Sequence, residues 1–212
     1  MSGYHDTRLA PDPRRDQVWK ALWCYYFRHR VMPSDRVLDL GSGYGDFINN
    51  VVAARRVAID LWPGFAAHLD DGVEAIVGPA SDLSGIADGS IDYAFASNLF
   101  EHLTQREFAD TLAGLRAKLS PNGSLTILQP NYRYAYREYF DDYTHVSIYS
   151  HISLCDFLAA NGFEPVEVRP RFLPLTVKSR LPAWGPLIGL YLSSPLKPAS
   201  KQMLVRARPR RP

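Results

Sequence analysis

Short runs of apolar residues, each ending near a glycine or a polar residue, recur along the chain and predict β-strands. Helical signals lie between several of them. The clearest is Thr104-x-x-Glu107, a capping box, which precedes apolar residues at helical spacing from Phe108 to Leu119. The predicted strands before residue 130 are 37–40, 56–60, 74–78, 91–97 and 124–129. This alternation predicts an α/β fold with a doubly wound, mostly parallel sheet that binds ligands at the carboxyl ends of its strands.

Further helices and strands are predicted on both sides of this series. Asp12-Pro13 combines an N-cap with proline at the first helical position. Ser153-x-x-Asp156 is a second helix-start signal, and Asn161-Gly162 ends that helix. The expected elements are helices within 12–31, from the glycines near 45 through about 54, and over 153–160, with strands at 164–171 and 201–208. We therefore expect residues 1–212 to form a single domain.

A glycine-rich turn follows the first predicted strand, in the pattern Asp39-x-Gly41-x-Gly43-x-Gly45. Glycine permits positive φ and removes the Cβ atom, so a ligand can lie against the backbone there. The dinucleotide fingerprint G-x-G-x-x-G/A needs a small residue where this chain has Asp46. The spacing therefore disfavours a nicotinamide cofactor.

This pattern closely resembles the first motif of Rossmann-like (class I) S-adenosylmethionine-dependent methyltransferases, in particular the bacterial methyltransferase type 11/23-like families. The resemblance spans roughly residues 35–172. It implies a seven-stranded sheet with an antiparallel last strand, and S-adenosyl-L-methionine as the cofactor. It also implies roles for individual residues: Gly41, Gly43 and Gly45 cradle the cofactor, Asp39 meets its ammonium group, Asp60 its ribose hydroxyls, Asp82 and the Leu83 backbone its adenine, and Asn98 lines the pocket.

Two histidines are the first candidates for a general base, because a neutral imidazole suits an oxygen or nitrogen acceptor. His145 is preferred, since it lies in the long aromatic segment 131–150, where substrates enter in the family that this chain resembles. His102 is ranked second. His151, Glu101, Asp141 and Asp142 are the remaining candidates.

Glu101-His102 also resembles part of the E-x-x-E-H pattern that binds a divalent metal in small-RNA 2'-O-methyltransferases. Asn98 stands where that pattern has its first acid. A hard cation that lacks one carboxylate is poorly held. The sequence therefore predicts no metal.

Composition limits the partners. The formal net charge of +2 does not favour nucleic acid, and Cys24 and Cys155 show no metal or disulfide spacing, which fits a reducing cytoplasm. Residues 173–200 form an apolar insertion with basic edges, typical of a membrane-surface helix, a flap or a dimer surface. We expect O-methylation of a small metabolite, sugar or lipid-linked glycan. A nicotinamide oxidoreductase and a noncatalytic cofactor-binding or membrane-docking module are the alternatives.

Overall fold

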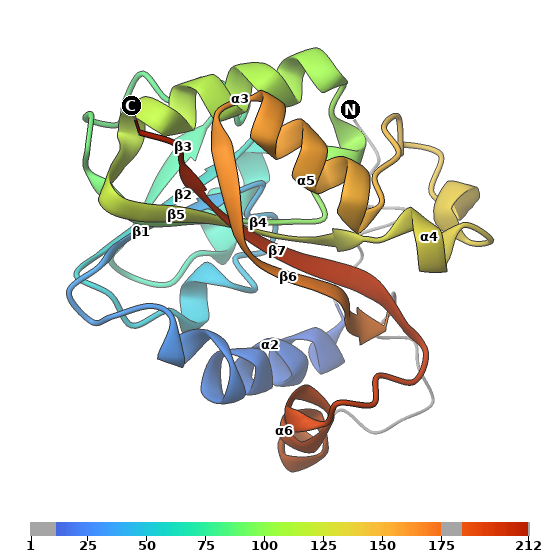
Figure 1. The fold of residues 1–212 in the computed structure, drawn as a ribbon. Helices are drawn as coiled ribbons and strands as arrows, with labels where there is room; N and C mark the ends of the chain where they lie inside the picture. Colours follow the sequence, from blue (N-terminus) through green and yellow to red (C-terminus); the bar gives the residue numbers. More distant parts are fainter. Residues whose placement is uncertain (1–11, 175–183, 212) are drawn as a thin grey trace.

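The fold is built around one twisted sheet (Figure 1). A computed structural model describes residues 12–174 and 184–211. Its strands lie in the order β3-β2-β1-β4-β5-β7-β6. Their bounds are β1 Arg36–Leu40, β2 Arg55–Asp60, β3 Val73–Val77, β4 Ile91–Ser97, β5 Leu119–Pro130, β6 Phe163–Pro174 and β7 Ser200–Pro209.

Helices cover both faces of the sheet. In Figure 1, α3 and α5 lie on one face and α2 and α6 on the other. Each face buries its own apolar cluster against the strands. The α-helices are α2 Pro13–Tyr25, α3 Gln105–Lys118, α4 Tyr132–Ala135, α5 His151–Ala160 and α6 Gly185–Ser193, and the 3-10 helices are η1 Phe27–His29, η2 Ile48–Asn50, η3 Pro63–His68, η4 Phe100–His102 and η5 Tyr139–Asp141.

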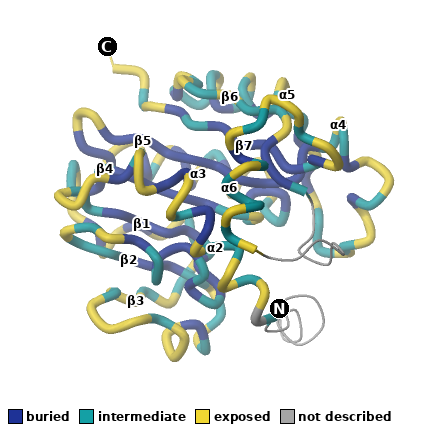
Figure 2. The backbone as a smooth tube through the Cα atoms, turned by 90° about the horizontal axis from the view of Figure 1, so that it is seen from below, coloured by how far each residue is buried: buried dark blue, intermediate teal, exposed yellow. Residues whose placement is uncertain are grey.

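Strand pairing confirms the predicted fold class. β1 pairs in parallel with both β2 and β4, so the order of the strands reverses at this point. β7 runs antiparallel to its two neighbours, β5 and β6. The middle strands are buried, whereas the edge strand β3 is exposed along much of its length (Figure 2). In an open α/β sheet, the reversal creates a crevice at the carboxyl ends of β1 and β4.

The predicted starts of two helices are confirmed. The Asp12 carboxylate accepts a hydrogen bond from the Arg14 backbone amide at 2.9 Å, which caps α2. Thr104 and Glu107 exchange the two hydrogen bonds of a capping box at the start of α3. The helix expected within 12–31 ends at Tyr25, and η1 follows it.

The helix expected between the glycines and residue 54 is wrong. Only the 3-10 helix η2 forms there, and the connections from β2 to β4 contain 3-10 and irregular turns in place of α-helices. Asn50 donates a side-chain hydrogen bond to the Asp46 carbonyl, and Asn49 bonds across to the backbone of His68 and Asp70. Asparagine side chains that bind backbone groups in this way compete with helical hydrogen bonds.

The start of α5 also differs from the prediction. Its N-cap is Ser150, which exchanges hydrogen bonds with Ser153 in a capping box, so the helix begins at His151. The two serines are three residues apart, and either can begin a helix on sequence grounds.

The apolar insertion 173–200 is described in part. β6 continues to Pro174, and α6 packs on α2 (Figure 1). A Cβ atom on Gly189 would lie 2.9 Å from the Tyr25 ring, so glycine permits close approach of the two helices. Residues 175–183, with the basic Lys178 and Arg180, lie outside the described residues.

Candidate functional site

The glycine loop after β1 has the backbone conformation that its sequence predicts. Gly41, Gly43 and Gly45 have φ angles of 68°, 53° and 72°. Residues with a Cβ atom rarely adopt this left-handed region. The backbone amides of Gly41 and Ser42 both donate to the Ile59 carbonyl, at 2.8 and 3.1 Å. The loop is therefore held against the end of β2.

The same loop makes close contact with the chain that follows β4. A Cβ atom on Gly41 would lie 2.9 Å from Leu99 Cδ1, and one on Gly45 would lie 2.8 Å from Asn49 Nδ2. The lack of side chains at these positions thus brings the loop and Leu99 together. Arg15 of α2 also reaches this loop, through an ion pair with Asp46.

Asp39, at the end of β1, is a buried acid next to the loop. Its side chain accepts a hydrogen bond from the Ser42 hydroxyl at 2.9 Å. Burial raises the pKa of Asp39 to about 8, the Ser42 hydrogen bond opposes this rise, and the nearby charges of Asp60 and Asp46 add to it. A cationic group bound beside Asp39 would therefore favour its ionised form.

Asp60 ends β2 and binds the loop directly. Its Oδ2 atom accepts a hydrogen bond from the Gly43 backbone amide at 2.8 Å, and its Oδ1 atom accepts one from the Trp62 backbone amide at 2.8 Å. A carboxylate has about four acceptor positions, so both oxygens can accept further hydrogen bonds. The predicted ribose ligand therefore lies beside the predicted cofactor cradle.

Asp82 and Leu83, the predicted adenine contacts, lie in the irregular connection between β3 and β4. Asp82 is exposed, and its carboxylate accepts hydrogen bonds from the Ser84 backbone and hydroxyl at 3.1 and 2.6 Å. These hydrogen bonds lower the pKa of Asp82. The Leu83 side chain is buried against Gly114 of α3. The adenine role of both residues stays a prediction.

Asn98 follows β4 in a left-handed conformation, with φ 49°. Its backbone amide donates to the Leu128 carbonyl at 2.8 Å, and its side-chain oxygen accepts a hydrogen bond from Gln202 of β7 at 2.9 Å. Asparagine tolerates this strained conformation better than most residues. Gln202 is a neighbour of the site that sequence reasoning missed, because the contact spans 104 residues.

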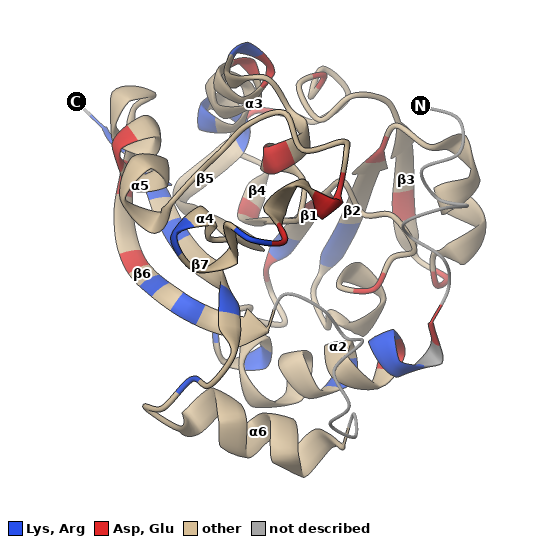
Figure 3. Cartoon of the chain, turned by 90° about the vertical axis from the view of Figure 1, so that its right-hand side faces the viewer, with Lys and Arg blue, Asp and Glu red and all other residues tan. Residues whose placement is uncertain are grey.

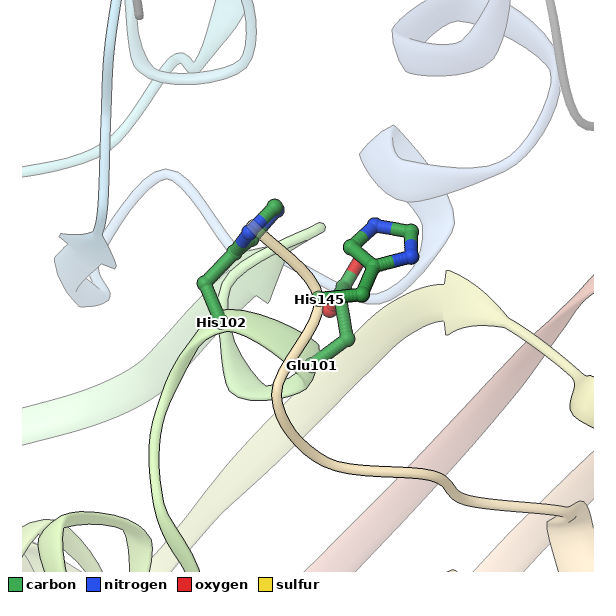
Figure 4. Close-up of side chains that lie close together, drawn as sticks. All are labelled: Glu101, His102 and His145. Carbon is green, nitrogen blue, oxygen red and sulfur yellow. The ribbon is translucent and has the colours of Figure 1, made fainter. Parts of the chain in front are cut away.

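A second cluster lies just beyond Leu99. Glu101 and His102 belong to η4, and the backbone amides of Val146 and Ser147 donate to the Glu101 carbonyl at 2.9 and 3.1 Å. These two hydrogen bonds bring segment 131–150 to η4 and place His145 beside His102, with a ring-centroid separation of 4.8 Å. Figure 4 shows the side chains of Glu101, His102 and His145 close together. The structure thus brings the two predicted base candidates into one site.

Hydrogen bonds to the Nδ1 atoms assign the tautomers of the neutral rings. The Nδ1 atom of His145 lies 2.6 Å from the Tyr139 carbonyl, which can only accept, so Nδ1 carries the proton. The Nδ1 atom of His102 lies 2.9 Å from the Thr144 hydroxyl, which donates its own hydrogen to Asp142. His102 Nδ1 is therefore also the donor. In both rings the lone pair is on Nε2, and burial followed by the charge of His145 lowers the pKa of His102.

Glu101 is fully buried at 0% exposure. Among the described residues, neither of its carboxyl oxygens has a hydrogen-bond partner. Burial raises the pKa of Glu101 to about 8, with a smaller contribution from Asp142. A buried carboxyl group without partners is costly and therefore uncommon outside functional sites.

The prediction of no metal rested on Asn98, Glu101 and His102. The structure adds His145, and one ligand atom from each of Glu101, His102 and His145 lies within 4.8 Å of the others.

Acidic positions surround the ends of β1, β2 and β4, whereas basic positions follow β6, β7 and α4 (Figure 3). The edge of the sheet that carries the glycine loop is thus its acidic side.

Comparison with known proteins identifies relatives of the chain. A family model described as a methyltransferase domain matches residues 8–168. A malonyl-[acyl-carrier protein] O-methyltransferase from Methylococcus capsulatus is 30% identical over 200 residues, covering 86% of this chain and 68% of the relative.

Solved structures share the fold. A methyltransferase from Archaeoglobus fulgidus, described as SAM-dependent, has a TM-score of 0.67 and 20% identity, covering 91% of this chain and 93% of that one. The Burkholderia thailandensis 1,6-didemethyltoxoflavin-N1-methyltransferase, solved with S-adenosylhomocysteine, has a TM-score of 0.64 and 20% identity, covering 99% and 85%.

Proposed function

Because the chain belongs to the S-adenosylmethionine-dependent methyltransferases, we propose that it methylates an oxygen atom of a small metabolite, sugar or lipid-linked glycan. Family membership makes the protein an enzyme with S-adenosyl-L-methionine as its methyl donor. It decides against the nicotinamide oxidoreductase and the noncatalytic module. The acceptor is the part that is proposed.

The residues around the glycine loop fit the cofactor. Three glycines of the loop have positive φ, so its backbone turns tightly without side chains, and the buried Asp39 lies next to the same loop, hydrogen-bonded to Ser42. We propose that Asp39 binds the ammonium group of the cofactor and that Asp60 accepts hydrogen bonds from its ribose hydroxyls. A carboxylate at the end of the second strand is suited to two vicinal hydroxyls.

The cofactor supplies an electrophilic methyl group. The protein must therefore hold an acceptor oxygen on the axis of the breaking bond, about 3 Å from the methyl, and assist removal of its proton. The choice of an oxygen acceptor rests on one observation. His145 lies beside His102, which follows Leu99 in the chain, and Leu99 packs against the glycine loop. The Nδ1 hydrogen bond to Tyr139 orients the His145 ring and makes Nε2 its basic nitrogen.

The relative from Methylococcus capsulatus is itself named an O-methyltransferase, which supports an oxygen acceptor. The acceptor of that protein is a carrier-bound malonyl group. We propose instead a small or glycan acceptor for this chain, because segment 131–150, which carries His145, exposes several aromatic rings, and such rings suit sugar faces. They are Tyr136, Phe140 and Tyr143.

The experiment is methyl transfer from S-adenosylmethionine to a panel of hydroxyl-bearing acceptors, followed by His145→Ala with an acceptor that is methylated. We expect turnover to fall by about 100-fold or more, the usual contribution of a positioned base. His151→Ala is the matched control, because His151 lies outside the cluster at the start of α5. Full turnover by His145→Ala would remove His145 from the reaction.

Among the described residues, no helix is long and apolar enough to cross a membrane. We propose that the enzyme works in the cytoplasm, at a membrane surface that it touches through residues 173–200. The exposed side chains of Trp184 (63%), the N-cap of α6, and Leu190 (66%), within α6, support this contact. Co-flotation with anionic vesicles should be lost in a Trp184→Ser, Leu190→Ser double variant, and equal flotation of both proteins would contradict it.

A further inference from the structure

We propose that Glu101, His102 and His145 bind a divalent first-row transition-metal ion beside the methyl-donor site. The three residues come from two segments that join through the hydrogen bonds of Val146 and Ser147 to the Glu101 carbonyl. One ligand atom of each residue lies within 4.8 Å of the others. The site thus has three donors on two backbone segments that are fixed to each other.

The carboxyl group of Glu101 is the first argument for a cation. It is fully buried, and both its oxygens are without hydrogen-bond partners among the described residues. A buried acid costs free energy unless it is paired with a charge or coordinates a metal. Two residues, His102 and His145, each have a ligand atom within 4.8 Å of one from Glu101 and are themselves metal ligands by type (Figure 4). A bound cation would provide the partner that the described protein groups do not.

The second argument is the outer shell of hydrogen bonds. Metal-binding histidines usually donate their other ring N–H to a carbonyl or carboxylate, which fixes the ring and its tautomer. His145 donates from Nδ1 to the Tyr139 carbonyl at 2.6 Å. His102 donates from Nδ1 to Thr144, and Thr144 donates to Asp142 at 2.6 Å. Both Nε2 atoms therefore carry the lone pair that a metal needs.

The donor set indicates the kind of metal. One carboxylate and two imidazoles suit ions such as Zn²⁺, Fe²⁺, Co²⁺ or Mn²⁺, whereas Mg²⁺ and Ca²⁺ prefer oxygen ligands. Metal bonds of about 2.1 Å place tetrahedral ligand atoms about 3.4 Å apart, so the cluster must contract slightly on binding. Three protein ligands leave at least one position open, as in catalytic zinc sites.

The open position gives the metal a role in the proposed reaction. An ion held by these residues would fix the position of an acceptor hydroxyl and lower its pKa, so that water could take its proton near neutral pH. His145 would then act through the ion rather than as the base itself. This role rests on the proposed function, whereas the binding of the metal does not.

The test is titration of the untagged full-length protein with Co²⁺, followed by its visible d–d absorption, without methyl donor or acceptor. We expect one equivalent to bind and to give the intense bands of a low-coordinate site. Glu101→Gln and His145→Ala should abolish this spectrum. Thr144→Val removes the hydroxyl that links His102 to Asp142 but none of the three ligands, so it should weaken binding by about 10 to 100-fold. His151→Ala should bind like the parent protein.

The proposal is overturned if Co²⁺ fails to bind, or if it binds equally well to the parent and to Glu101→Gln and His145→Ala. Circular dichroism checks that each variant is folded, and Glu101→Gln preserves the shape of the side chain. Titration of the same samples with S-adenosylhomocysteine tests the methyl-donor site separately. Donor binding without cobalt binding would refute the metal alone, and cobalt binding without donor binding would refute the proposed function alone.

Discussion

The carboxylate of Asp60 accepts a hydrogen bond from the backbone amide of Gly43 at 2.8 Å, so a side chain at the end of β2 holds the glycine loop. The other oxygen of Asp60 accepts a hydrogen bond from the Trp62 amide. Asp60 therefore shapes the cradle as well as facing the place where a ribose is expected. Loss of the Asp60 side chain should therefore remove both the support of the glycine loop and the expected contact with the ribose.

Asp60→Ala should weaken the binding of S-adenosylhomocysteine by about 1–3 kcal/mol, the cost of hydrogen bonds lost to a charged group. Isothermal titration calorimetry measures this change. Asp82→Ala is the comparison: Asp82 is exposed and would make one hydrogen bond to the adenine, whereas Asp60 would bind two ribose hydroxyls, so a smaller loss of affinity is expected. Unchanged affinity of Asp60→Ala would remove Asp60 from the site.

Gly41→Ala should destabilise the protein and weaken donor binding together. The φ angle of 68° strains any residue with a Cβ atom, and that atom would lie 2.9 Å from Leu99 Cδ1. The left-handed conformation alone costs about 1–2 kcal/mol. Gly89→Ala is a matched control, since Gly89 has φ 64° with nothing within 4 Å of the added atom. Denaturant unfolding should show a larger loss for Gly41→Ala, and equal losses would contradict the steric argument.

Much of the fold could be predicted from local signals. The strands are short apolar runs, and the capping box of Thr104 and Glu107 depends on residues three apart, so both can be found in the sequence. The helix expected after Gly45 failed because the side chains of Asn49 and Asn50 bond to backbone carbonyls. The partner of Asn49, His68, is 19 residues away, so this contact cannot be found from sequence spacing.

The candidate site could be predicted only where its residues follow one another along the chain. The glycine loop and the acids at the ends of β1 and β2 belong to this class. The meeting of Glu101 with His145 does not, because it depends on backbone hydrogen bonds between η4 and segment 131–150. The contact of Asn98 with Gln202 likewise requires knowledge of how β7 lies beside β5.

Glu167 of β6 should make stability depend on acid pH. Burial raises its pKa, but hydrogen bonds from Arg30, Arg169 and Tyr26 outweigh burial and lower the pKa to about 2. A depressed pKa contributes stability that is present above the unfolded value near 4.5 and lost as the pH falls toward 2. Glu167→Gln should therefore lower the free energy of unfolding at pH 7 by about 1–3 kcal/mol and flatten this dependence.

Urea unfolding between pH 3 and pH 7 measures the effect. Glu164→Gln on the same strand is the control, because Glu164 is exposed and its loss should change the free energy of unfolding by less than about 0.5 kcal/mol. Equal pH dependence of the parent protein and Glu167→Gln would show that this cluster does not couple to stability.

Asp39 should couple donor binding to a proton. Burial raises its pKa to about 8, so at pH 7 the carboxyl group is mostly protonated before binding. The ammonium group of S-adenosylhomocysteine favours the ionised form, which means that binding lowers the pKa of Asp39 and releases up to about one proton. Affinity should accordingly rise with pH from 6 to 8, by at most about tenfold per pH unit, and then level off.

Calorimetry at pH 7 in phosphate and in Tris, whose ionisation enthalpies differ, gives the number of protons released. Asp39→Asn should bind more weakly and release none, because it carries no titrating proton. Proton release that persists in Asp39→Asn would assign the titrating group to another residue, and the absence of release in the parent protein would separate Asp39 from the ammonium group.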